Sequence, residues 1–126
     1  METHHIFLAY HTGIASVFPV IKERLANHAQ VSLLYFSSNH LFDFRKELHI
    51  LQCHFSSQLY ISYESSYTEK DGLLNQDNIE AVINANTAPT MCFTISGNPQ
   101  FSERINEVLH FLGMKNIIMQ EQYFVA

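Results

Sequence analysis

The sequence predicts an α/β protein whose parallel sheet is covered by helices on both faces. Short, nearly continuous apolar runs alternate along the chain with segments in which apolar residues recur at helical spacing. Strands that are apolar on both faces are typical of a parallel sheet between two helical layers. The 126 residues fit a single domain, 1–126, which is long enough to bury a core without disulfides or metals.

The first strand, the first helix and the second strand follow one another over residues 5–36. Residues 5–10 and 31–36 are apolar runs of strand length. Apolar residues at helical spacing mark the helix between them: Ile14, Val17, Phe18, Ile21 and Leu25. Pro19 is tolerated there if the regular helix begins near Ser16, because the N–H groups of a first helical turn have no helical partner to lose.

In the middle of the chain, the apolar pattern predicts two helices that flank a third strand at residues 59–63. The apolar positions that mark these helices are Phe44, Leu48 and Leu51 for the first and Ile79, Val82 and Ile83 for the second. A polar loop at 65–72 separates the strand from the second of them, and Asn75 is a possible cap.

The last third of the chain contains the best-defined helix. A fourth strand at 91–95 leads into the turn Gly97-Asn98-Pro99, in which the asparagine suits the N-cap and the proline the first helical position. The apolar stripe of this helix is Phe101, Ile105, Val108, Leu109 and Leu112. Gly113 is expected just past its end, and residues 116–119 form the fifth strand.

The composition excludes several classes of protein. The chain has 12 acidic and 7 basic residues, whereas proteins that bind nucleic acid through its phosphates are usually basic. The two cysteines, Cys53 and Cys92, form no CxxC pair and indicate a reducing, cytoplasmic setting. No apolar run approaches the length of a membrane span, and a signal peptide is not expected.

Ligands of doubly wound sheets bind beyond the carboxyl ends of the strands, at the point where the strand order reverses. Four segments lie at such ends here: residues 10–15, 36–39, 96–99 and the tail after Met119. In the first, Gly13 allows the backbone to approach an anion, and the N–H groups of the following helix favour a phosphate. A glycine at this turn also fits a purely packing role, and both interpretations stay open.

Four motifs, in order along nearly the whole chain, resemble the C-terminal, pyridine-nucleotide-binding domain of the ferredoxin–NADP reductase family of flavoenzymes. Residues 8–16 (LAYHTGIAS) match the family's first strand and its Gly-Gly-Thr-Gly-Ile-Ala-Pro turn. The second strand and helix, LLYF at 33–36 and FRKEL at 44–48, match the family's Leu-Leu-Tyr-Gly and Phe-Arg-x-Glu-Leu. SGNP at 96–99 corresponds to the family's Cys-Gly-Pro-Pro, and EQY at 121–123 corresponds to its terminal Glu-x-Phe or Glu-x-Tyr.

The resemblance implies a three-layer αβα, Rossmann-like domain with strand order 3-2-1-4-5. It also implies that the domain holds NAD(P)H, while a separate barrel domain holds FAD or FMN. By residue, it implies that Thr12 and Gly13 lie at the pyrophosphate, that Ser37, Ser38 and Asn39 face the adenosine ribose, and that Ser96 and Gly97 lie near the nicotinamide. Glu121 and Tyr123 would lie near the flavin interface. The full set is His11, Thr12, Gly13, Ile14, Ser37, Ser38, Asn39, Gly97, Asn98, Pro99 and Tyr123 for cofactor binding, with Ser96 and Glu121 as catalytic positions.

The leading hypothesis is an NAD(P)H-binding module of a flavin-dependent oxidoreductase, which positions the nicotinamide for hydride transfer to a flavin held by another domain or chain. The chain is not expected to be active alone. The alternative is a degenerate Rossmann-like domain for interaction or regulation, with weak or no nucleotide binding. Tyr10 and His11 replace the family's two glycines, and Ser96 replaces its cysteine. If position 11 requires a positive φ, a non-glycine residue there costs about 1–2 kcal/mol.

Other chemistries have weaker signals. The 8 histidines form no HxxxH or HExxH pair, so no metal site is expected. A serine hydrolase is not indicated either, because no GxSxG turn is present.

Overall fold

The computed structural model describes residues 3–37, 42, 44–64, 79, 83–84, 90–114 and 117–120. Their strands form one sheet in the order β3-β2-β1-β4-β5, and every neighbouring pair is parallel. The strands are β1 (Thr3–Tyr10), β2 (Gln30–Phe36), β3 (Leu59–Glu64), β4 (Thr90–Ser96) and β5 (Ile117–Gln120). The α/β class and the strand order 3-2-1-4-5 are thus confirmed, and the strands differ from the predicted ranges only at their ends.

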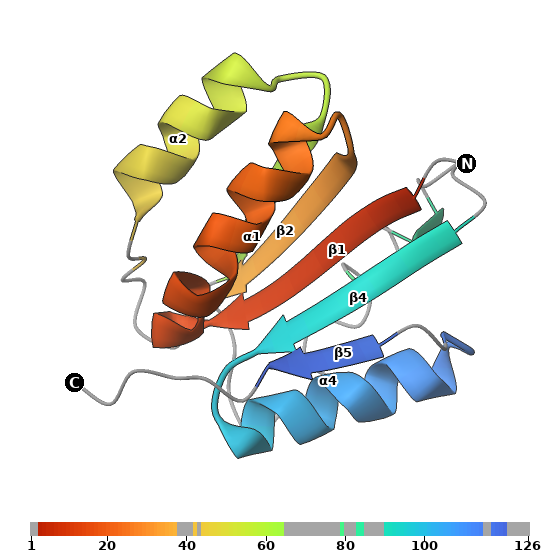
Figure 1. Cartoon of the computed structure of the whole chain (residues 1–126). Coiled ribbons are helices and arrows are strands. Elements are labelled where there is room, and N and C mark those ends of the chain that lie inside the picture. The colour runs from red at the N-terminus through yellow and green to blue at the C-terminus, as the bar shows by residue number, and fades with distance from the viewer. Residues whose placement is uncertain are drawn as a thin grey trace.

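Helices cover both faces of the sheet (Figure 1). They are the 3-10 turn η1 (His11–Gly13), α1 (Ile14–Ala26), α2 (Arg45–His54) and α4 (Pro99–Phe111). Side chains alternate along β1, so that Phe7 and Ala9 join a core with α1 and α2, while Ile6 and Leu8 join a second core with α4. This alternation produces the three-layer αβα arrangement.

Helix α1 begins earlier than the sequence predicts. It starts at Ile14 rather than near Ser16, so Pro19 lies inside the helix beyond its first turn. Ile14 and Val17 are fully buried, and a helix that starts at Ile14 turns both side chains into the core. Pro19 itself is on the exposed side. The packing of the core therefore outweighs the hydrogen bond that the proline removes.

Helix α4 has the predicted ends. Asn98 is its N-cap, and the side-chain Oδ1 accepts a hydrogen bond from the Phe101 N–H at 2.8 Å. Gly113 follows the helix with φ of 84°. The N–H groups of Gly113 and Met114 donate to the carbonyls of His110 and Leu109, at 3.0 and 2.9 Å, which is a Schellman motif.

The helix predicted around residue 80 lies mostly outside the described residues. Ile79, Ile83 and Asn84 are helical, and Ile79 is buried in the core beside α4. Val82 and the possible cap Asn75 are not among the described residues. Within the part of the chain that the structure covers, no helix has the length and apolarity to cross a membrane.

Candidate functional site

The strand order reverses beside β1. From β1 the chain proceeds through α1 to β2 on one side, whereas β4 and β5 lie on the other side. Ala9 and Ser96 are register partners at the carboxyl ends of β1 and β4. The β1–α1 turn and the β4–α4 turn therefore meet at this edge, and their helices leave toward opposite faces (Figure 1). This is the position where doubly wound sheets bind ligands.

Gly13 is required by the close approach of these two turns. A Cβ atom at this position would collide with the carbonyl oxygen of Ser96 and lie 3.1 Å from the Gly97 nitrogen. The φ of Gly13 is −60°, so its backbone conformation alone does not require glycine. The packing role left open by the sequence is therefore present, and it keeps the first turn of α1 against the end of β4.

Ser96 links the same two turns from the side of β4. Its side chain is fully buried, and its Oγ donates a hydrogen bond to the Gly13 carbonyl at 2.9 Å. The hydroxyl predicted to lie near a nicotinamide thus has a partner within the protein. In this arrangement Ser96 positions the Gly13 turn.

His11 has a backbone conformation that favours glycine. Its φ is 50°, so the condition stated from the sequence is met, with a cost of about 1–2 kcal/mol for a non-glycine residue. The His11 carbonyl accepts a hydrogen bond from the hydroxyl of buried Tyr35 at 3.3 Å. That bond helps to hold the turn in its strained conformation.

Aromatic side chains pack around the β4–α4 turn. The Tyr10 ring stacks on Phe101 with centroids 5.2 Å apart, and it meets the His11 ring edge-on at 4.2 Å. A Cβ atom on Gly97 would lie 3.0 Å from the Tyr10 Cβ and 2.7 Å from Phe101 Cδ2. Gly97 therefore has no room for a side chain between the two rings. We call Tyr10, His11 and Phe101 the edge aromatic cluster.

The other predicted residues have varied positions. Ser37 is fully buried just after β2, and Ile14 is buried in the core beneath α1. Asn98 and Pro99 occupy the N-cap and first position of α4. Thr12 belongs to the turn η1. Four predicted residues lie outside the described residues and stay predictions: Ser38, Asn39, Glu121 and Tyr123.

A cationic pocket that the sequence analysis did not single out lies between α2 and β3. Its volume is about 550 Å³, and its lining consists of Arg45, Lys46, His49, Gln52 and Tyr63. The Arg45 guanidinium lies 4.6 Å from the centroid of the Tyr63 ring and 5.7 Å from that of Phe42. Burial raises the pKa of Tyr63, and the charge of Arg45 opposes this shift. Because Tyr63 is near the carboxyl end of β3, the pocket belongs to the same edge of the sheet as Gly13.

No protein-family model and no curated protein matches this chain. Solved structures do match it. The CS-b5R domains of human Ncb5or, in the NAD+ form, are 17% identical with a TM-score of 0.74, over 94% of this chain and 36% of that one. Ferredoxin-NADP+ reductase from Plasmodium falciparum is 19% identical with a TM-score of 0.73, over 95% of this chain and 52% of that one.

A third neighbour corresponds to this chain over most of its own length. The C-terminal domain of PF1911 hydrogenase from Pyrococcus furiosus is 13% identical with a TM-score of 0.67, over 94% of this chain and 92% of that domain. The chain spans only about a third to a half of the human and Plasmodium proteins. The resemblance to the ferredoxin–NADP reductase family indicated by the sequence motifs is confirmed as a similarity of fold.

Proposed function

We propose that this chain is the NAD(P)H-binding module of a flavin-dependent oxidoreductase, and that it positions the nicotinamide for hydride transfer to FAD or FMN held by another domain or chain. The observation that carries the proposal is the meeting of the β1–α1 and β4–α4 turns at the point where the strand order reverses. The similar fold of human Ncb5or in its NAD+ form supports the same assignment.

In this proposal the backbone does most of the binding. The dipole of α1 places partial positive charge at the start of this helix, which favours a pyrophosphate beside Thr12 and Gly13. Gly97 would present backbone rather than side chain to the nicotinamide end. Hydride chemistry belongs to the bound nucleotide and the flavin, so the chain contributes binding and orientation. Ser96 would act by holding the Gly13 turn in place.

A second candidate is an interaction or regulatory domain that binds nucleotide weakly or not at all. The edge aromatic cluster favours this function, because the rings of Tyr10 and His11 pack where the family has two glycines. The positive φ of His11 favours it as well, since a strained histidine replaces a residue that costs nothing there.

Calorimetric titration of the chain with NADH, NADPH and ADP-ribose separates the two candidates. The test variant is His11→Gly, and the matched control is His28→Gly, which changes the same residue type at another positive φ of 64° in the α1–β2 turn. If the His11 side chain crowds the pyrophosphate at a cost of about 1.4 kcal/mol, its removal in His11→Gly would strengthen binding about tenfold and leave His28→Gly like the wild type.

Each outcome of this titration decides between the candidates. Binding of ADP-ribose by the wild type supports the oxidoreductase module. Binding only by His11→Gly identifies a nucleotide site closed by substitution, which favours the interaction domain. Absence of binding in both proteins contradicts nucleotide binding by this domain.

A further inference from the structure

A polar cavity lies at the opposite edge of the sheet from the candidate nucleotide site. Its volume is about 350 Å³, and it is enclosed by the amino ends of β1 and β2 and by the last turn of α1. Its polar lining residues include Thr3, His5, Arg24 and Asn27. Among the described residues that line the cavity all are neutral or basic, so none of them is an acidic neighbour of Arg24.

Arg24 lines this cavity, and its guanidinium carries a buried donor without a partner in the described part of the chain. Among the described residues, its Nε is a buried nitrogen that has no hydrogen-bond partner. Its Nη1 is 3.5 Å from the carboxylate of Glu23, whose side chain is 65% exposed, so this ion pair is weak. A buried donor without a partner is costly, and a guanidinium with only a weak ion pair is suited to charge-assisted hydrogen bonds with an oxyanion.

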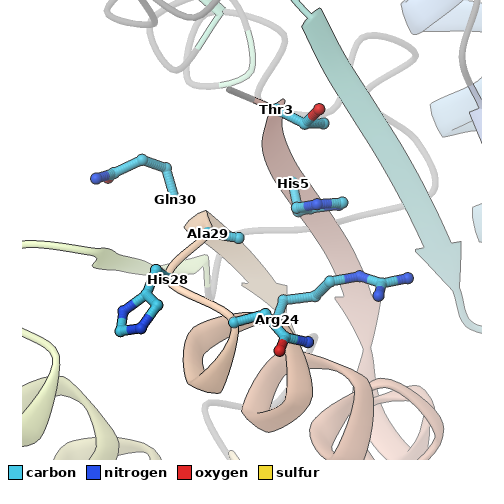
Figure 2. Close-up of a pocket in the computed structure, with 7 residues that line it drawn as sticks. Thr3, His5, Arg24, His28, Ala29 and Gln30 are labelled. Atoms are coloured by element: carbon cyan, nitrogen blue, oxygen red, sulfur yellow. The ribbon is translucent and has the colours of Figure 1, made fainter. Parts of the chain in front are cut away.

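Side chains from β1 point to the same side as Arg24. Figure 2 shows Thr3, His5 and Arg24 extending to one side, while His28 and Gln30 point to the other. Thr3 and His5 are two residues apart on β1 and thus share one face of the sheet. A guanidinium, an imidazole and a hydroxyl therefore converge from a helix and a strand.

The end of helix α1 does not oppose an anion as strongly as a free helix end would. Its terminal carbonyls already accept hydrogen bonds: Arg24 from Ala29 N at 3.0 Å, and Leu25 from His28 N at 3.0 Å. Gln58 Nε2 donates to the carbonyls of Leu25 and Ala29 as well. These bonds leave fewer unsatisfied carbonyl groups at this end of α1.

The pKa of His5 is sensitive to charged groups in the cavity. Burial chiefly, and then the charges of Arg24 and His4, lower the pKa of His5 from 6.5. At neutral pH the imidazole is therefore uncharged and offers one N–H donor. An anion beside it would counteract the charge of Arg24 and raise that pKa.

We propose that this cavity binds a phosphate group, as free phosphate or as a small phosphate monoester, through the guanidinium of Arg24 with His5 and Thr3 as further donors. Donors on three side chains suit a tetrahedral group with several oxygens better than a carboxylate with two. The site does not rest on the proposed function, because it lies at the amino ends of the strands and ADP-ribose would bind at their carboxyl ends.

The test is an NMR titration of the whole chain that follows the His5 ring and the Arg24 Nε–H. Potassium phosphate, glycerol phosphate and acetate are added separately at constant ionic strength, with potassium chloride as the reference. Phosphate should give saturable shifts and raise the pKa of His5. Arg24→Gln should weaken binding about tenfold or more, since it removes a charge-assisted pair of bonds.

Two further variants separate charge from geometry. Lys22→Gln removes the same charge from the same helix outside the cavity and should bind phosphate like the wild type. Arg24→Lys keeps the charge without the planar, multidentate guanidinium and should bind more weakly than the wild type. Saturation by free phosphate, by the ester, or by both supports the site and identifies the source of the phosphate. Shifts that only follow chloride, equal saturation by acetate, or unchanged binding in Arg24→Gln would overturn it.

Discussion

At the scale of single residues, the left-handed position that follows a helix is occupied by different residue types in α1 and α4. Both α1 and α4 end in Schellman motifs, with His28 and Gly113 at the left-handed position. The φ of His28 is 64°, and its side chain is exposed. The same backbone requirement is thus met by a suitable residue in α4 and by an unsuitable one in α1.

We predict that His28→Gly raises the free energy of unfolding by about 0.5–1 kcal/mol. Glycine removes a left-handed penalty of about 1–2 kcal/mol and loses part of that gain through the greater entropy of the unfolded chain. Urea denaturation measures the difference. His28→Ala is the control, because alanine keeps the strain, and a stabilisation of equal size in both variants would contradict this explanation.

Gly13 should be intolerant of even a methyl group. Gly13→Ala places a Cβ against the backbone of Ser96 and Gly97, which cannot move without displacing the end of β4. We expect a loss of about 1–3 kcal/mol from overpacking, measured by urea denaturation. Gly113→Ala is a useful comparison, since open space surrounds that position and the cost there comes from its φ of 84° alone. Unfolding stability of Gly13→Ala equal to the wild type would show that the two turns can separate freely.

At the scale of elements, the N-cap of α4 is the best-defined local signal. Asn98→Ala removes the bond from Oδ1 to the Phe101 N–H and should lower the free energy of unfolding by about 1 kcal/mol. Thermal or urea unfolding measures this loss. Asn98→Asp keeps an acceptor at the same place and should retain most of the stability, so an equal loss in both variants would argue against capping.

The pocket between α2 and β3 gives a prediction about the cofactor. Arg45, Lys46 and His49 line it from one helix, and Arg45 is held against Tyr63. If the adenosine end of the nucleotide extends to this pocket, its cations would favour the additional phosphate of NADPH over NADH. Arg45→Ala should then weaken NADPH binding about tenfold and leave NADH nearly unchanged, as calorimetry can measure. Arg104→Ala on α4 is the control, and equal effects on both nucleotides would contradict the assignment.

Local sequence signals predicted the elements well where the chemistry is local. The capping residues Asn98 and Gly113 identified both ends of α4, because they bond to backbone groups a few residues away. The predicted start of α1 near Ser16 was wrong, because it gave more weight to the tolerance of Pro19 in a first helical turn than to the apolar spacing that begins at Ile14. Burial of Ile14 in the core is a tertiary effect, and it places Pro19 beyond the first turn.

At the scale of the whole molecule, the pattern of apolar runs predicted a parallel sheet, but not its strand order. The order came from the family resemblance, because periodicity does not say which strands are neighbours. The same limit applies to the site. The sequence identified the turns at Gly13 and Gly97, whereas the stacking of Tyr10 on Phe101 and the bond from Ser96 to Gly13 depend on contacts between distant segments.

The carboxyl and amino edges of the sheet carry different side chains and differ in packing. The carboxyl edge has closely packed backbone turns, the edge aromatic cluster and the Arg45 pocket. The amino edge has the polar cavity beside Arg24 and His5. This separation means that the proposed nucleotide site and the proposed phosphate site can be tested independently in one chain.

The most direct test of nucleotide binding at the carboxyl edge is an amide NMR titration of the ¹⁵N-labelled chain with ADP-ribose. We predict saturable shifts for the amides of Gly13 and Gly97, because both lie in the turns that meet where the strand order reverses. The amide of Gly113, at the far end of α4, should stay unchanged and serves as an internal reference. Shifts that spare Gly13 and Gly97, or no saturable shift at all, would contradict the nucleotide-binding account.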